Sequence, residues 1–133
     1  GPEMRRFFFS VDEASDLVIK SIEEINRLKG KVFSKKMKSA KISNILDIWT
    51  SIYNCSWKKI DQRPEDKTDE YLIARHELEN TFLFKIKDQV YYIIDFYNKY
   101  KECLLEEYTT YNSEKLSKIE ITNLIKMKPK NLI

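Results

Sequence analysis

The chain has 133 residues, with 24 basic and 21 acidic side chains and a formal net charge of +3. This length suits one domain, and a charge so near balance excludes any argument for nucleic-acid binding from the overall field alone. Gly1 and Pro2, with Glu3, are typical of a cleavage remnant from recombinant expression, so residues 1–4 are set apart and residues 5–133 are expected to form a single domain. Gly30 is then the only remaining glycine, which disfavours the turn-rich chain of a β fold.

The first half of the chain shows three helical patterns. Ser10 opens a capping box, and apolar residues then recur at helical spacing up to Gly30, which predicts a helix over residues 11–29 that ends at this glycine. A short helix is expected over residues 32–39, with its lysines facing outward. Another helix is expected over residues 43–53, where an apolar stripe follows a serine that can cap it.

The second half begins with a polar loop over residues 54–69. We expect a fourth helix over residues 70–80 and a long fifth helix over residues 81–108, which is apolar on more than one side and therefore central. Ser117 opens a second capping box before a short final helix. The sequence thus predicts the all-α class: a compact, single-domain helical bundle of about five to six helices.

The cysteines and the histidine do not suggest a metal centre. Cys55 and Cys103 are far apart in sequence, and His76 is the only histidine. Zinc and iron–sulfur centres usually need four ligands, so no metal and no cofactor are expected. Free thiols favour a reducing, cytoplasmic (intracellular) setting, and the apolar run at residues 7–9 is too short for a signal peptide or a membrane span.

Catalytic residues are not apparent either. The sequence has no glycine-rich phosphate loop, no nucleophile with an evident base partner and no paired metal-binding carboxylates. Asp12, Glu13 and Asp16 cluster in the first turns of a predicted helix, where the helix dipole alone favours acidic residues. We therefore expect no independent enzyme activity and no catalytic residue.

A basic segment is the main candidate for a binding site. The seven cations between residues 25 and 42 are accompanied by no acidic residue, whereas a solvated helix face usually mixes both signs. Arg27, Lys31 and Lys38 lie near a predicted helix junction, where backbone amides can add to phosphate binding. The alternative is that the lysines form an ordinary solvated face.

Three residues after the polar loop form a second candidate. Tyr71 and Arg75 are four residues apart, so on a helix a base could stack on the phenol while the guanidinium holds phosphate, with His76 beside them. The alternative is that Arg75 pairs with a carboxylate and that Tyr71 packs in the core. Trp57 is a further possible stacking residue, or else it anchors the loop to the core.

The order of these residues resembles the C-terminal domain of the large subunit of archaeal and eukaryotic DNA primases. The matching segments are Arg27 to Lys31, Lys38, Ile45 to Trp49, and Tyr71 to His76. Members of that family hold an iron–sulfur cluster through four cysteines, and neither Cys55 nor Cys103 falls where those ligands belong. The chain is therefore similar to a domain of this family without its cluster, as in the small third subunit of some archaeal primases.

This resemblance implies the fold of that C-terminal primase domain and a non-catalytic, accessory role in primer initiation. The implied partners are the catalytic small subunit and the large subunit of primase, a nucleotide triphosphate, and a DNA template with an RNA/DNA primer, with no membrane. The implied nucleotide- and nucleic-acid-binding residues are Arg27, Lys31, Lys38, Trp57, Tyr71, Arg75 and His76. The alternatives are a helical protein-interaction module and a general nucleic-acid-binding domain.

Overall fold

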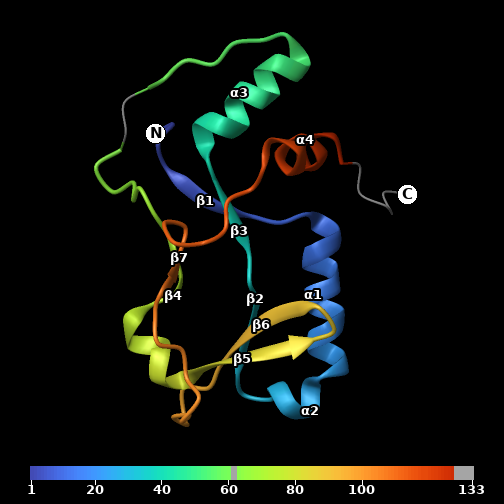
Figure 1. Cartoon of the computed structure of the whole chain (residues 1–133), viewed down its shortest axis with the longest axis vertical. Helices are drawn as coiled ribbons and strands as arrows, with labels where there is room; N and C mark the ends of the chain where they lie inside the picture. Colours follow the sequence, from blue (N-terminus) through green and yellow to red (C-terminus); the bar gives the residue numbers. More distant parts are fainter. Residues whose placement is uncertain (61–62, 128–133) are drawn as a thin grey trace. The chain divides into compact units, whose positions relative to one another are not determined.

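The computed structural model describes residues 1–60 and 63–127, and these form a mixed α/β fold with small antiparallel sheets (Figure 1). The expectation of an all-α bundle is therefore wrong. The helical elements are α1 (Val11–Glu23), α2 (Ile25–Leu28), α3 (Ile42–Tyr53), the 3-10 helix η1 (Arg75–Asn80) and α4 (Lys118–Lys126). The strands are β1 (Arg5–Phe8), β2 (Val32–Lys35), β3 (Lys38–Lys41), β4 (Tyr71–Ile73), β5 (Thr81–Ile86), β6 (Gln89–Ile94) and β7 (Tyr108–Thr109).

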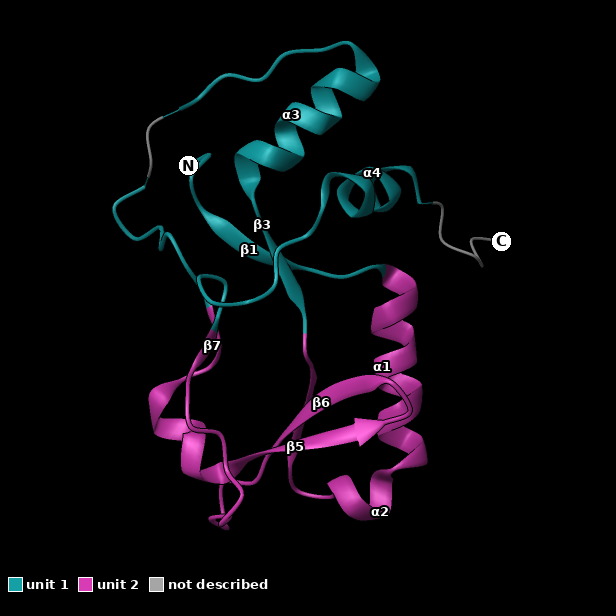
Figure 2. Ribbon diagram, viewed as in Figure 1, with its two compact units in different colours: residues 1–10, 37–70, 109–133 teal, residues 11–36, 71–108 magenta. Residues whose placement is uncertain are grey.

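The chain divides into two compact units (Figure 2). Unit 1 comprises residues 1–10, 37–70 and 109–133, and unit 2 comprises residues 11–36 and 71–108. Each unit is therefore assembled from segments that are distant in sequence, and each is described separately below. In the described part of the chain, no helix is both long and apolar enough to cross a membrane.

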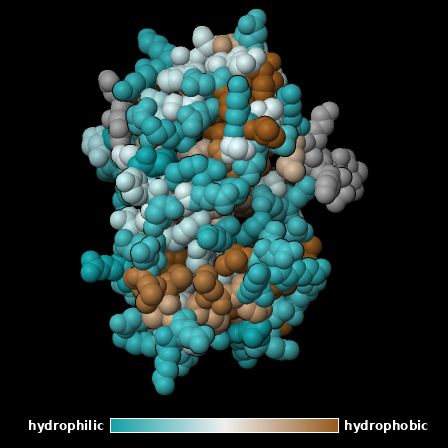
Figure 3. Space-filling view, in the orientation of Figure 1, coloured by the Kyte–Doolittle hydropathy of each residue, from teal (hydrophilic) through white to brown (hydrophobic). Residues whose placement is uncertain are grey.

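Unit 2 is organised by a three-stranded sheet in the order β2-β6-β5. Both pairings are antiparallel, and Ile93 of the central strand faces Phe33 of β2 on one side and Phe82 of β5 on the other. Alternate side chains of a strand point to opposite faces, so Tyr92 and Ile94 share one face. Tyr92 and Ile94 pack with Ile73 of β4 as a buried cluster. Figure 3 shows further apolar side chains gathered over the part of unit 2 that holds β5.

The helix predicted over residues 81–108 is instead the β5–β6 hairpin followed by irregular chain. Its connection is only two residues long, and Lys87 adopts the left-handed backbone conformation, with φ 53°. A run of β-branched and aromatic residues in β6 suits a central strand that is covered on both faces. The helix predicted over residues 70–80 is also wrong, because this segment forms β4 and η1; β4 pairs with β7.

The helix predicted over residues 11–29 is largely confirmed as α1 and α2, which break at Glu24. Gly30 follows them with φ 74°, the left-handed conformation expected just past a helix end. The short helix predicted over residues 32–39 is wrong, since β2 and β3 occupy this segment. Within unit 2, α1 packs against β2 at one edge of the sheet.

Unit 1 is built on the antiparallel pair β1–β3, with α3 packed against β3 and α4. The prediction of a helix over residues 43–53 is confirmed, but its N-cap is Lys41 and not Ser43, which lies inside the helix. The final helix with its Ser117 capping box is also confirmed. Residues 1–4 are joined to the start of α3: Pro2 O accepts from Ser43 N at 2.8 Å, and Met4 O accepts from Ile42 N at 2.9 Å.

Candidate functional site

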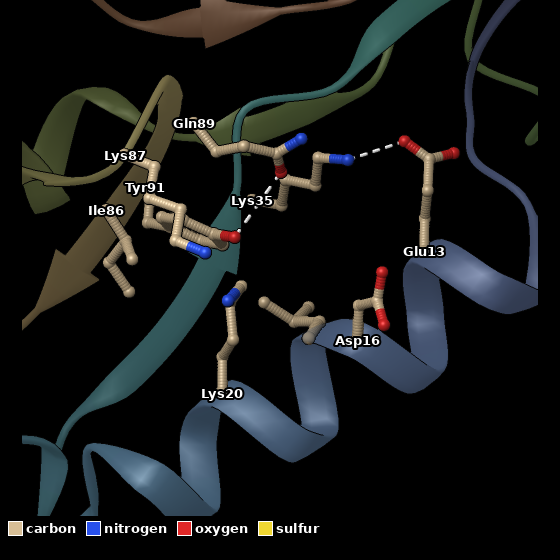
Figure 4. A pocket seen from close by; sticks show the side chains of 9 residues that line it. Glu13, Asp16, Lys20, Lys35, Ile86, Lys87, Gln89 and Tyr91 are labelled. Atoms are coloured by element: carbon tan, nitrogen blue, oxygen red, sulfur yellow. Dashed lines mark hydrogen bonds and ion pairs between the residues drawn. The ribbon is translucent and has the colours of Figure 1, made fainter.

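A pocket in unit 2 lies between α1 and the edge formed by β2 and the β5–β6 hairpin (Figure 4). Its cavity volume is about 230 Å³. One face of α1 lines one side, because residues 13, 16, 17 and 20 recur at helical spacing. The strands line the other side, and the residues involved are Lys35, Ile86, Lys87, Gln89 and Tyr91.

Four of the polar lining groups are bound to one another in two pairs. The Lys35 ammonium donates to the Glu13 carboxylate at 2.5 Å, and the Tyr91 hydroxyl donates to Gln89 Oε1 at 3.3 Å. The first pair joins β2 to the first turn of α1 and holds the helix over the sheet. The second pair is long, so Gln89 and Tyr91 keep capacity for a ligand.

The remaining cations of the pocket have no such partners. In the described part of the chain, the side-chain ammonium groups of Lys20 and Lys87 take part in no hydrogen bond or ion pair, and Figure 4 shows both side chains extending into the space between α1 and the hairpin. Asp16 is likewise without an ion pair among the described residues and is exposed at the rim. Two unpaired ammonium groups that converge on one cavity favour an anionic ligand.

Tyr91 forms the floor of the pocket. Its ring stacks on Phe33 with centroids 4.8 Å apart, and its side chain is almost fully buried. Burial raises the pKa of the Tyr91 hydroxyl, with a smaller contribution from the charge of Asp16. The hydroxyl therefore stays protonated at neutral pH and can donate to a ligand oxygen.

Three of the sequence-predicted site residues belong to the basic segment, and each has an intramolecular contact. The Arg27 guanidinium lies over the Phe84 ring, 4.3 Å from its centroid, and the Lys31 ammonium is 3.6 Å from Asp95 Oδ2. Lys38 binds Glu114, and also Glu120 at 2.9 Å, and these two carboxylates raise the pKa of Lys38. Lys38 lies in unit 1, whereas Arg27 and Lys31 lie in unit 2.

The other predicted residues are also distributed between the units. Trp57 is in unit 1 and donates from Nε1 to Asp47 Oδ1 at 2.9 Å, which anchors the loop to α3. Tyr71, Arg75 and His76 are in unit 2, on β4 and η1 and not on one helix. In the described residues, no hydrogen bond, ion pair or ring contact joins any two of the seven predicted residues, so their role in ligand binding stays a prediction.

A polar cluster in unit 1 resembles a serine–lysine catalytic pair, but its geometry is structural. Ser113 Oγ donates to Ser39 Oγ at 2.7 Å, and Lys115 Nζ lies 3.2 Å from the same Ser39 oxygen. The Lys115 ammonium also donates to the carbonyls of Thr110, Tyr111 and Ser113 at 2.6, 2.8 and 2.9 Å. Burial and Arg5 lower the pKa of Lys115, but only the protonated amine can satisfy three carbonyls at once, so Lys115 is not a free base.

A second cavity, of about 390 Å³, lies in unit 1 between α3 and α4. Ile48, Ile52 and Ile121 line much of it, and Lys118 is its only lysine. Its one carboxylate, Asp47, is already held by Trp57. This cavity lacks converging unpaired charges, so the lysine-lined pocket is the stronger candidate.

Comparison with known proteins assigns the family. A family model described as Polysaccharide biosynthesis protein matches residues 1–92. The chain belongs to this family. Membership corrects the primase identification, and with it the accessory role in primer initiation and the expectation that the chain is not an enzyme, because this is a family of enzymes. Among curated proteins, none matches the sequence.

The fold of this chain is similar to that of a solved structure. The X-ray structure of Pen from Bacillus thuringiensis is similar to 94% of this chain, with 21% identity and a TM-score of 0.76. The chain spans 38% of the length of Pen. This likeness shows the fold alone.

The described residues do not fit a dinucleotide cofactor. Such a cofactor needs a glycine-rich turn between a strand and a helix of a parallel sheet. The sequence has only Gly1 and Gly30, and Gly30 follows a helix and precedes a strand. The strand pairs whose register is described are antiparallel. We derive no chemistry through a dinucleotide from this chain.

Sequence reasoning missed most of the pocket. The helix dipole alone accounts for Glu13 and Asp16 in the sequence, and no sequence pattern indicates a binding role for Lys20 or Lys87. The signal that could have found the pocket is the face of α1 that carries residues 13, 16 and 20. It could be recognised only with the hairpin opposite, and that hairpin was mistaken for helix.

Proposed function

We propose that this chain contributes the sugar-binding part of an enzyme that modifies a sugar nucleotide for polysaccharide biosynthesis. Family membership over residues 1–92 supports the enzyme class. The main evidence for a binding site is the pair Lys20 and Lys87. Their ammonium groups enter one cavity, and neither has a carboxylate partner among the described residues. Sugar nucleotides carry the phosphates that such a pair attracts.

The volume of the cavity limits what it holds. At about 230 Å³ it is smaller than the ~300 Å³ at which pockets for larger ligands begin. It therefore accommodates a phosphate or one sugar ring, while the rest of a sugar nucleotide extends beyond it.

The lining suggests separate roles. Lys20 and Lys87 hold a phosphate from the helix side and the hairpin side, respectively. Asp16 accepts hydrogen bonds from sugar hydroxyls, and Gln89 can donate or accept. The ion pair of Lys35 with Glu13 positions α1 and does not need to contact the ligand. Roles that involve only binding and orientation match a chain without a dinucleotide loop.

The test is a calorimetric titration of the chain with UDP-glucose, with Lys20→Ala and Lys87→Ala variants. Each variant removes one charge-assisted contact to phosphate, so the dissociation constant should rise about tenfold. Lys85→Ala is the matched control, because Lys85 is exposed on β5 and does not line the pocket. Its affinity should stay within about twofold of the unchanged chain.

Two results decide against the proposal. One is binding of UDP-glucose that is equally strong in Lys20→Ala, Lys87→Ala and the control, and the other is no binding at low ionic strength. ATP in the same titration tests the nucleotide triphosphate predicted from the sequence. The primase subunits, template and primer predicted as partners depended on the primase resemblance and stay untested predictions.

A further inference from the structure

The cavity between α3 and α4 in unit 1 has the size of a small-molecule site. Its volume is about 390 Å³, within the ~300–1,000 Å³ that ligand pockets typically have. Both helices belong to unit 1 (Figure 2), and they pack against each other. One face of α3 lines one side, because residues 44, 47, 48, 51 and 52 recur at helical spacing, and α4 lines the other. We call this space the α3–α4 cavity.

The least exposed part of the α3–α4 cavity is apolar. Ile121 of α4 is only 3% exposed, and the other apolar lining residues, Ile48, Ile52 and Leu116, are half-buried. These four side chains are aliphatic, and the described lining residues include no aromatic ring. Nucleobases are usually held by stacking on aromatic rings, so this surface does not suit a base. It suits a ligand that presents aliphatic C–H groups on one face.

A row of polar side chains on α3 accompanies this apolar surface. Asn44, Asp47 and Ser51 are exposed, and residues 44 to 51 span about 10 Å of helix. Among the described residues, the side chains of Asn44 and Ser51 form no hydrogen bond or ion pair. Asp47 Oδ1 accepts from Trp57 Nε1 at 2.9 Å, and in the same part of the chain Asp47 Oδ2 has no such partner. The row therefore offers donors as well as acceptors, which matches a ligand with several hydroxyl groups.

The charged groups of the α3–α4 cavity balance each other in number. Asp47 is the one carboxylate and Lys118 the one ammonium among the described lining residues. One charge of each sign gives no net attraction for a phosphate or for a cation, in contrast to the lysine-lined pocket of unit 2. Both groups can still form hydrogen bonds with hydroxyls, the carboxylate as acceptor and the ammonium as donor.

We infer that the α3–α4 cavity binds a neutral saccharide. A sugar ring has an aliphatic C–H face and an edge of hydroxyl groups, so it matches both parts of the lining. The C–H face packs on Ile48, Ile52 and Ile121, and the hydroxyls bind the polar row of α3. This is a second site, in a different unit from the sugar-nucleotide pocket, and it does not depend on that proposal.

The test is an NMR titration of the full chain with three neutral disaccharides: maltose, lactose and N,N′-diacetylchitobiose. At least one of them should cause saturable shifts of amide signals in α3 and α4. Asn44→Ala and Ser51→Ala each remove one uncharged hydrogen-bonding group, so each should raise the dissociation constant about three- to tenfold. Asn123→Ala is the matched control, because Asn123 is exposed on α4 but does not line the cavity. Its dissociation constant should equal that of the unchanged chain.

Two further measurements test the location and the charge of the ligand. Ser51→Trp introduces a large side chain into the lining from an exposed position, so it should abolish the shifts while circular dichroism shows that the chain remains folded. The disaccharides carry no charge, so raising sodium chloride to about 1 M should leave their affinity unchanged. The affinity for UDP-glucose, which depends on lysine and phosphate, should fall under the same conditions.

The inference is overturned if none of the three disaccharides causes saturable shifts, if the shifts are confined to unit 2, or if Ser51→Trp binds as tightly as the control. Stronger binding of leucine than of every disaccharide would also overturn it, because Asp47 and Lys118 would then form a site for a zwitterion. Loss of UDP-glucose binding with intact disaccharide binding refutes only the lysine-lined pocket, whereas the reverse result refutes only the saccharide site.

Discussion

Lys115 holds the turn that precedes α4, and replacing it with methionine tests whether this cation is structural. Its ammonium donates to the carbonyls of Thr110, Tyr111 and Ser113 within 2.9 Å. Methionine keeps most of the length of the side chain but removes every donor. The Thr110 carbonyl keeps the Ser39 hydroxyl as a donor at 3.0 Å.

The expected loss follows from these bonds. A hydrogen bond to a charged group contributes about 1.5–3 kcal/mol when it is shielded from water. Lys115 is exposed along part of its length, so water can form hydrogen bonds with the carbonyls in the variant. We therefore expect a loss of about 1 kcal/mol in the free energy of unfolding for each carbonyl. The free energy of unfolding of Lys115→Met should therefore fall by about 2–3 kcal/mol, which for a chain of this size lowers Tm by roughly 10 °C.

The assay is urea denaturation of the full chain, followed by circular dichroism, with calorimetry as a second measurement. Lys118→Met is the matched control, because Lys118 is exposed in the same unit and its side chain has no ion pair in the described structure. Its free energy of unfolding should change by less than about 0.5 kcal/mol. Equal stability of Lys115→Met and the control would refute the structural role, and the serine–lysine pair would then need another explanation.

Three further changes test other parts of the structure. The hydrogen bonds of Tyr100 and Asn98 lower the pKa of Asp95 to about 2. The contribution of Asp95 to the free energy of unfolding is therefore present above about pH 4 and is lost as the pH falls toward 2. Asp95→Asn should make the free energy of unfolding, followed by fluorescence, less dependent on pH in this range. Lys87→Val should lower the free energy of unfolding by about 1–2 kcal/mol, because a branched side chain disfavours positive φ. Lys87→Gly should change it by less than about 0.5 kcal/mol. Equal urea midpoints for the two variants would contradict this prediction. Ile93→Ala leaves a cavity in the central strand and should cost about 2–5 kcal/mol in denaturant unfolding; a loss below about 1 kcal/mol would contradict the assigned register.

Local signals predicted some elements of this fold correctly. The capping box at Ser117 precedes α4, with Ser117 Oγ accepting from Glu120 N and Glu120 accepting from Ser117 N. Gly30 has the positive φ expected after a helix. Such signals depend on a few neighbouring residues, so a sequence displays them directly.

The sheets were missed because their determinants are not local. The apolar run at residues 90–94 predicted a central helix, but these residues belong to the central strand of a sheet whose partners lie elsewhere in the chain. The hairpin turn contains Lys87 and Asp88 where asparagine or glycine is the usual signal. The scarcity of glycine disfavours a turn-rich β fold, yet Lys87 supplies the positive φ that this turn requires. The enrichment of β-branched and aromatic residues was the available indication.

The surroundings of the α1 helix could not be predicted from local sequence either. Its helical period correctly predicted a helix with one apolar face. The structure instead turns the charged face, with Lys20 and Asp16, toward the sheet and leaves Val18 and Ile22 exposed. Periodicity identifies which residues share a face but not what covers it. A helix that lines a polar pocket with one side therefore presents its apolar side to solvent in this structure.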